Sequence, residues 1–210
     1  MAHDDFAFDQ VKGLPEAPPP GEEILWQGRP SAYALLRDAL MLRWIVGYFA
    51  VLALWRVAAS LGEMGLGTAV LTAVPLVALG AATVAILYGF AWLQARAAMY
   101  TVTTHRVALR CGAALQVTFN IPYRWIGNLN MDLRPDGTGT IAIQTTGDTK
   151  ISYLIAWPHV RPWRIAETEP ALRCIPDCER VARILAEAAE ARLTQPVVDR
   201  LPRAAAVAAE

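Results

Sequence analysis

The sequence has little net charge and few residues that could build a chemical site. Its 210 residues include 19 basic and 19 acidic side chains, for a formal net charge of zero, with three histidines and three cysteines. Balanced charge argues against nucleic acid as a partner, because proteins that bind DNA or RNA present basic surfaces. An odd number of cysteines without paired spacing does not form a disulfide framework, so we expect free thiols.

Catalytic and nucleotide-binding motifs are missing as well. The chain has no Gly-Lys phosphate loop, no Gly-x-Ser-x-Gly and no His-Glu-x-x-His segment. His105 and His159 have no carboxylate at the spacing of a triad or a metal site, and Cys174 with Cys178 lacks further zinc ligands. We therefore expect no enzyme, no catalytic residue, no metal and no cofactor.

Two long apolar stretches, residues 44–61 and 66–93, dominate the first half of the chain. The second stretch contains no charged residue. A helix needs about 20 apolar residues to cross a bilayer, so the pair predicts a transmembrane helical hairpin over 43–95. The first ten residues are acidic and lack an apolar core, so we expect no signal peptide.

Arginines flank both outer ends of the hairpin and are absent from its connecting loop. They are Arg29, Arg37 and Arg43 before it, and Arg96, Arg106 and Arg110 after it. Positively charged residues stay on the cytoplasmic side of a membrane. We therefore expect a bacterial cytoplasmic membrane, either inner or intracytoplasmic, with both termini in the cytoplasm.

Few features interrupt the apolar surface of the hairpin. Arg56 is the one charge within a span, and it either pairs with a partner or lipid or extends to the near interface. Pro75 predicts a bend in the second helix. Ala81, Ala85 and Gly89 form a small-residue stripe that lets another helix approach closely. That helix is either the first span of the same chain or a helix of a partner.

Beyond residue 98 the sequence changes to the pattern of short β-strands. Turn signals, such as residues 134–137 (Arg-Pro-Asp-Gly), separate β-branched or alternating runs. The predicted strands cover 100–103, 106–112, 116–122, 125–133, 139–145 and 149–157. Strands this short and closely spaced indicate an antiparallel sandwich or barrel.

An amphipathic helix follows the strands. It is expected to begin near Pro176, and apolar residues recur along it at helical spacing. They are Val181, Ile184, Leu185, Ala188 and Leu193. The expected domains are a flexible tail over 1–20, a juxtamembrane segment over 21–42, the hairpin over 43–95, a β domain with its helix over 98–194, and a flexible tail over 195–210.

Arginine and tryptophan concentrate in two segments of the soluble half, 122–125 and 157–164. Both residue types are favoured at protein interfaces and against lipid headgroups. A structural role at strand ends is the alternative. The candidate partner-binding residues are Arg124, Trp125, Trp157, Arg161, Trp163 and Arg164, together with Ala81, Ala85 and Gly89.

Several runs resemble membrane-anchored bacterial proteins with a pleckstrin-homology (PH)-like domain. They are residues 21–30 ahead of the hairpin, 100–107 after it, and 157–160. Segments 13–23, 157–163 and 172–177 resemble the photosynthetic-complex assembly proteins of purple bacteria. The resemblance implies a seven-stranded PH-like barrel capped by the C-terminal helix.

The resemblance also implies a non-enzymatic factor that assists assembly of the photosynthetic reaction centre and its core light-harvesting antenna. The implied partners are reaction-centre subunits and core antenna polypeptides. We also expect contact with membrane lipid, and a homodimer is left open. The alternative is a general membrane-anchored PH-like scaffold or lipid-binding module unrelated to photosynthesis.

Overall fold

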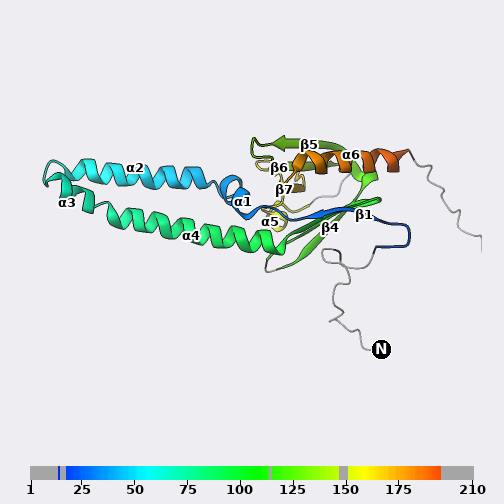
Figure 1. The fold of residues 1–210 in the computed structure, drawn as a ribbon, viewed down its shortest axis with the longest axis horizontal. Helices are drawn as coiled ribbons and strands as arrows, with labels where there is room; N and C mark the ends of the chain where they lie inside the picture. Colours follow the sequence, from blue (N-terminus) through cyan, green and yellow to red (C-terminus); the bar gives the residue numbers. More distant parts are fainter. Residues whose placement is uncertain (1–13, 15–17, 114, 147–150, 195–210) are drawn as a thin grey trace, which may run out of the picture.

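The computed structural model describes residues 14, 18–113, 115–146 and 151–194, which form a helical hairpin and a β domain arranged end to end (Figure 1). The predicted tails over 1–20 and 195–210 lie outside the described residues, except for residues 14 and 18–20. The fold class expected from the sequence is confirmed, with two apolar helices, antiparallel sheets and a C-terminal helix.

The hairpin consists of helix α2 (Leu42–Ser60), the short helix α3 (Leu66–Leu71) and helix α4 (Val74–Ala97). Leu42–Ser60 and Leu66–Ala97 are each long and apolar enough to cross a membrane. At about 1.5 Å per residue, α2 and α4 are about 28 and 36 Å long, which suits the roughly 30 Å hydrocarbon core of a bilayer.

The second apolar stretch is broken close to where the sequence predicts a bend. The helix stops at Leu71 and a new one starts at Val74, directly before Pro75. A proline inside a helix lacks its backbone N–H and clashes with the carbonyl four residues earlier, here that of Leu71. Pro75 therefore falls in the first turn of α4, where proline is tolerated.

Helices α2 and α4 approach closely at one glycine. A Cβ atom on Gly80 would lie 3.0 Å from Cγ of Phe49, so a larger residue would push the phenylalanine away. Near the loop end, Ser60 Oγ and Thr72 Oγ1 share a hydrogen bond of 3.4 Å. Arg56 is exposed on α2.

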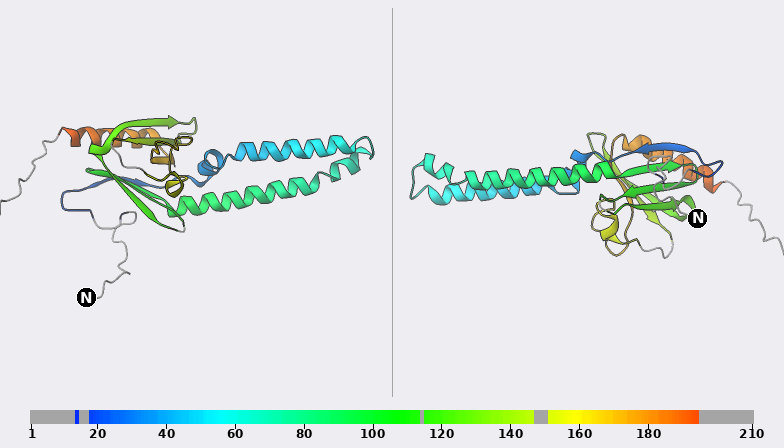
Figure 2. Two further views of the ribbon diagram at one scale, coloured as in Figure 1. Left: turned by 180° about the vertical axis from the view of Figure 1, so that it is seen from behind. Right: turned by 90° about the horizontal axis from the view of Figure 1, so that it is seen from below.

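The β domain contains two antiparallel sheets. The first has the order β1-β2-β3-β4, with β1 (Ile24–Gly28), β2 (Met99–Thr103), β3 (Arg106–Cys111) and β4 (Val117–Pro122). The second has the order β5-β6-β7, with β5 (Ile126–Leu133), β6 (Gly139–Thr145) and β7 (Ala171–Ile175). Helix α6 (Cys178–Leu193) packs against strands of both sheets (Figures 1 and 2). The seven strands among the described residues and the capping helix agree with the PH-like architecture.

The hairpin is inserted within the β domain. Strand β1 precedes the hairpin in sequence, within the segment 21–42 that we expected to be juxtamembrane. It pairs with β2, which begins two residues after α4 ends. Helix α1 (Ala32–Asp38) then connects β1 to the hairpin. The first sheet therefore combines a strand from each side of the hairpin.

The strand predicted over 149–157 is wrong. Tyr153–Ala156 form a short helix, α5, and residues 149–150 lie outside the described residues. The run is rich in apolar residues, but β6 is already paired with β5 and β7 on its two sides. The sequence did not predict strand β7, because Arg173 interrupts its short apolar run.

Two apolar cores hold the molecule together. The main core lies between the sheets and α6, and includes Tyr100, Ile143 and Leu185, all fully buried. A smaller core fixes the hairpin to the β domain, because α1 packs against both α4 and β7. Its members are Ala34, Leu35, Leu36, Ala91 and Cys174. The hairpin is therefore joined to the domain by packing as well as by the chain.

Candidate partner-binding surfaces

The two Arg- and Trp-rich segments lie at opposite ends of the β domain. Arg124 and Trp125 directly precede β5, which extends for about 24 Å at about 3.4 Å per residue. The far end of β5 faces the hairpin, because Arg134 there contacts Asp38 of α1 at an Nε–Oδ2 distance of 2.9 Å. Trp157, in contrast, contacts helix α4 itself.

Arg124 and Trp125 form an exposed pair on the 3-10 helix η1 (Tyr123–Trp125). The guanidinium Cζ of Arg124 lies 5.6 Å from the centroid of the Trp125 ring, a cation–π distance. The buried Tyr123 hydroxyl donates to the Thr103 carbonyl at 2.6 Å. The pair is thus held on a fixed turn, at the end of the domain farthest from the hairpin.

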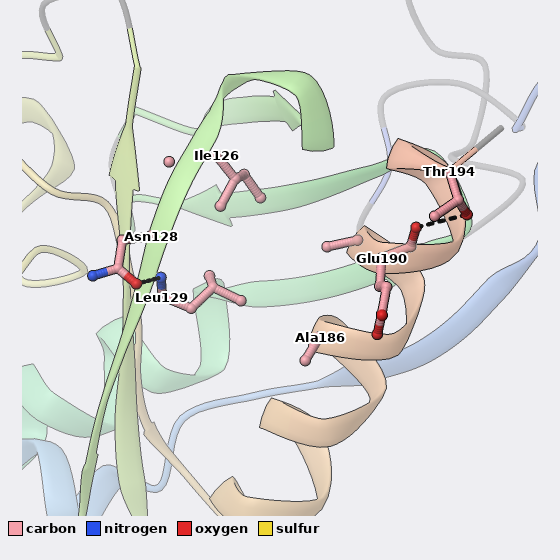
Figure 3. A pocket seen from close by; sticks show the side chains of 8 residues that line it. Ile126, Asn128, Leu129, Ala186, Glu190 and Thr194 are labelled. Carbon is pink, nitrogen blue, oxygen red and sulfur yellow. Dashed lines mark hydrogen bonds between the residues drawn. The ribbon is translucent and has the colours of Figure 1, made fainter. Parts of the chain in front are cut away.

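A groove of about 430 Å³ lies beside β5, between this strand and the last turns of α6. Ile126 and Leu129 enter it from the strand, and Ala186, Glu190 and Thr194 line it from the helix (Figure 3). Within the described residues, β5 pairs on one side only, with β6. An unpaired strand edge beside an apolar groove can accept an extended segment of another chain.

Trp157 makes a contact within the chain. Its ring stacks on Phe90 of α4, with the centroids 6.0 Å apart and the ring planes at 26°. The indole is half-buried, and a cis peptide bond joins it to Pro158. The contact adds to the packing that fixes the hairpin to the β domain.

Arg161 and Arg164 hold a buried carboxylate. Arg161 Nη1 lies 2.9 Å from Oε2 of Glu169, and Arg164 Nη1 lies 3.7 Å from Oε1. The Glu169 side chain is only 4% exposed, so losing its charged partners would be costly. Trp163, between the two arginines, has a positive φ of 65° and is 82% exposed.

His159 belongs to a buried hydrogen-bonded network. Its Nδ1 lies 2.6 Å from the Tyr100 hydroxyl, and the Arg173 backbone N–H donates to that hydroxyl at 3.3 Å. Arg173 Nη1 also donates to the Pro158 carbonyl at 3.1 Å. Burial lowers the pKa of His159 to about 4. Sequence reasoning missed this role because Tyr100 is 59 residues away along the chain.

The small-residue stripe of Ala81, Ala85 and Gly89 lies on the exposed side of α4. Helix α4 turns a different face to α2, with Gly80 against Phe49. The stripe therefore does not serve the packing within the hairpin. Packing of the stripe on the first span is therefore wrong, and packing against a partner's helix stays a prediction.

The three cysteines are free and buried. Burial raises the pKa of each thiol to about 11. A buried, protonated thiol is a poor nucleophile and a poor metal ligand. In the part of the chain that the structure describes, no three His, Cys, Asp or Glu side chains are grouped as a metal ion would require.

Comparison with known proteins agrees with the architecture. The family described as bacterial PH domain matches residues 42–189, from the start of α2 into α6. A protein of Rhodobacter capsulatus, described as the uncharacterized 23.7 kDa protein in the puhA 5' region, is 47% identical over 214 residues. The alignment covers 100% of this chain and 99% of the relative. No solved structure matches the chain.

The family match covers both the hairpin and the domain that it enters. The two antiparallel sheets and the capping helix α6 are the parts that a PH-like domain requires. With the match over most of its length and a close full-length relative, the chain belongs to the bacterial PH domain family.

Proposed function

We propose that this chain is a non-enzymatic assembly factor of the PuhB type, which assists biogenesis of the photosynthetic reaction centre and its core light-harvesting complex by binding assembling subunits. Segments 13–23, 157–163 and 172–177 resemble PuhB, the photosynthetic-complex assembly protein of purple bacteria. The Rhodobacter capsulatus relative is described by its place in the puhA 5' region, and the names puhA and PuhB begin with the same three letters.

The observation that carries the proposal is the insertion of the hairpin between β1 and β2. An assembly factor for membrane complexes has to bind subunits that have both membrane-spanning and soluble parts. Helix α1, packed against α4 and β7, holds the hairpin and the β domain in one arrangement. Such a junction lets one protein contact both parts of a subunit at a set spacing.

The proposed orientation places the β domain and both termini in the cytoplasm. Arg43 lies near the start of α2 and Arg96 near the end of α4, so both arginines are at the end of the hairpin that joins the β domain. Positive residues are retained on the cytoplasmic side. The hairpin then spans the inner or intracytoplasmic membrane, and the loop before α3 faces the periplasm.

Two exposed surfaces are suited to subunits of the assembling complex. The stripe of Ala81, Ala85 and Gly89 would pack against a transmembrane helix, because small side chains let helix backbones approach. Arg124 and Trp125, with the groove beside β5, would bind a soluble segment.

The proposal is tested by affinity capture of the tagged protein from membranes solubilised in mild detergent. Reaction-centre subunits and core antenna polypeptides should be recovered with the native chain. Trp125→Ala should reduce their recovery several-fold at an unchanged level of the bait, since aromatic anchors dominate interfaces. Trp163→Ala, in the other Arg- and Trp-rich segment, shows which of the two candidate segments binds the subunits. Capture lost with Trp163→Ala but kept with Trp125→Ala would contradict this placement.

A general membrane-anchored scaffold or lipid-binding module is the second candidate function. The exposed apolar side chains near the hairpin, Leu154 among them, favour it. The same capture experiment separates the two candidates. Recovery of lipid without any reaction-centre or antenna polypeptide would favour the second.

A further inference from the structure

Several of the most exposed large apolar side chains of the described β domain belong to one segment, which contacts the hairpin through Trp157. Four of them belong to the segment 151–165 and are called the apolar rim below. The rim comprises Leu154 (85% exposed), Ile155 (58%), Trp163 (82%) and Ile165 (69%). A soluble domain rarely exposes side chains of this size together without a contact partner.

The α5 part of the apolar rim lies beside the uncharged part of α4. Trp157, directly after α5, stacks on Phe90, which lies about 10 Å before the end of α4 at Ala97. Toward that end, Cζ of Arg96 lies 5.4 Å from the Trp92 ring centroid. Such an arginine and tryptophan pair is typical of the headgroup region. The segment beside Phe90 is thus at the boundary between headgroups and hydrocarbon.

Helix α5 projects sideways from the hairpin at this end of the domain (Figure 2, right). It carries Leu154 and Ile155, both exposed. The loop between β3 and β4 ends at the same side, because Met99, just after α4, pairs with Arg110 near the end of β3. Leu115 in that loop is 82% exposed. Two separate segments at this end of the domain therefore expose apolar side chains.

The base of the rim segment is fixed to the domain. Ala156 and Val160 are buried, and Val160 forms an isolated bridge with Pro170. Arg161 pairs with Glu169, and His159 bonds Tyr100. The exposed apolar side chains are thus carried by a segment whose other side is tightly packed.

We infer that the apolar rim inserts into the headgroup–acyl boundary of the same bilayer that the hairpin crosses. The occupant is lipid, because the rim continues the apolar surface of α4 at the depth where hydrocarbon begins. The β domain then rests on the membrane beside the hairpin instead of standing clear of it. The inference depends on the hairpin crossing a membrane and is independent of any role in assembly.

The test is spin-label accessibility of the full chain in vesicles of phosphatidylcholine with a minority of phosphatidylglycerol. Labels are placed at Leu154→Cys and Trp163→Cys, with Ala191→Cys on the exposed far end of α6 as control. The native cysteines are buried, with the pKa of each raised to about 11, so the native chain serves as the unlabelled blank.

At both rim positions, the ratio of accessibility to oxygen over accessibility to a water-soluble nickel chelate should be several-fold higher than at position 191. Ratios equal to that of position 191 would overturn the inference, because the rim would then lie in water. Shielding from both reagents would also overturn it, because a second copy or another protein would then cover the rim. Since the vesicles contain no reaction-centre subunit, either result is separate from failure of the assembly role.

Discussion

At the scale of single residues, charged side chains near the hairpin hold separate segments of the chain together. Oδ1 of Asp38 accepts a hydrogen bond from Nε of Arg37 at 3.1 Å, and Oδ2 of Asp38 lies 2.9 Å from Nε of Arg134. Nη1 of Arg37 also lies 2.6 Å from Oδ2 of Asp136. These pairs attach α1 to the turn between β5 and β6. The hydroxyl of Thr138 and the Arg37 guanidinium hold the pKa of Asp136 at about 2.

His159 predicts a pH-dependent stability. Its pKa falls from an ordinary 6.5 to about 4 because burial disfavours the imidazolium. Between these pH values the unfolded chain binds more protons than the folded chain. The contribution of neutral His159 to the free energy of unfolding is therefore fully present above pH 6.5 and is lost as pH falls toward 4. The expected loss is about 3 kcal/mol, from about 1.4 kcal/mol per pKa unit.

Thermal unfolding of the detergent-solubilised chain across this pH range measures the effect. His159→Gln, which cannot titrate, is the matched control and should show a flatter dependence on pH. Parallel curves for the native and variant chains would exclude His159 as the source.

At the scale of elements, α6 lies unusually close to β6. A Cβ atom on Gly139 would lie 2.6 Å from Sγ of Cys178 and 2.7 Å from the Asp132 carbonyl oxygen. No side chain larger than hydrogen fits between the start of α6 and this strand without a shift of backbone. Gly139 therefore allows the start of the capping helix α6 to pack this closely against β6.

Gly139→Ala should destabilise the β domain by about 1–3 kcal/mol through overpacking. Gln144→Ala, exposed on the same strand, should change stability by no more than about 0.5 kcal/mol. The midpoints of thermal unfolding of the two variants and the native chain make the comparison. An unchanged midpoint for Gly139→Ala would show that α6 can move away without cost.

Elements with a regular hydrophobic period were predictable from the sequence. The hairpin follows from the length of its apolar runs, and α6 from a stripe in which Val181, Leu185 and Ala188 are all buried. Strand β1 was not predictable from the sequence, because its partner β2 follows the hairpin in the chain. No pattern local to the chain shows which distant strand will supply a pairing edge.

The candidate surface was predictable only in part. Composition identified Arg124 and Trp125, and the structure exposes both on one turn. Composition equally identified Trp157 and Arg161, which contact Phe90 and Glu169 within the chain. Arginine and tryptophan serve interfaces and internal junctions alike, so only the fold distinguishes the two uses.

At the scale of the whole molecule, an apolar hairpin and a PH-like domain share one chain and one junction. The small core of α1, α4 and β7 keeps them in a set arrangement. The groove beside β5 lies far from the hairpin, whereas the segment that carries the apolar rim contacts the hairpin. The proposed membrane face and the proposed partner face therefore lie at opposite ends of the domain.

The most direct test of the proposed assembly role is deletion of the gene in its native host, followed by absorbance of the reaction centre and core antenna in isolated membranes. Both signals should fall several-fold in the deletion strain and return when the native chain is supplied. Supply of the Trp125→Ala chain, at an equal level in the membrane, should restore them only in part. Unchanged absorbance in the deletion strain would contradict the account.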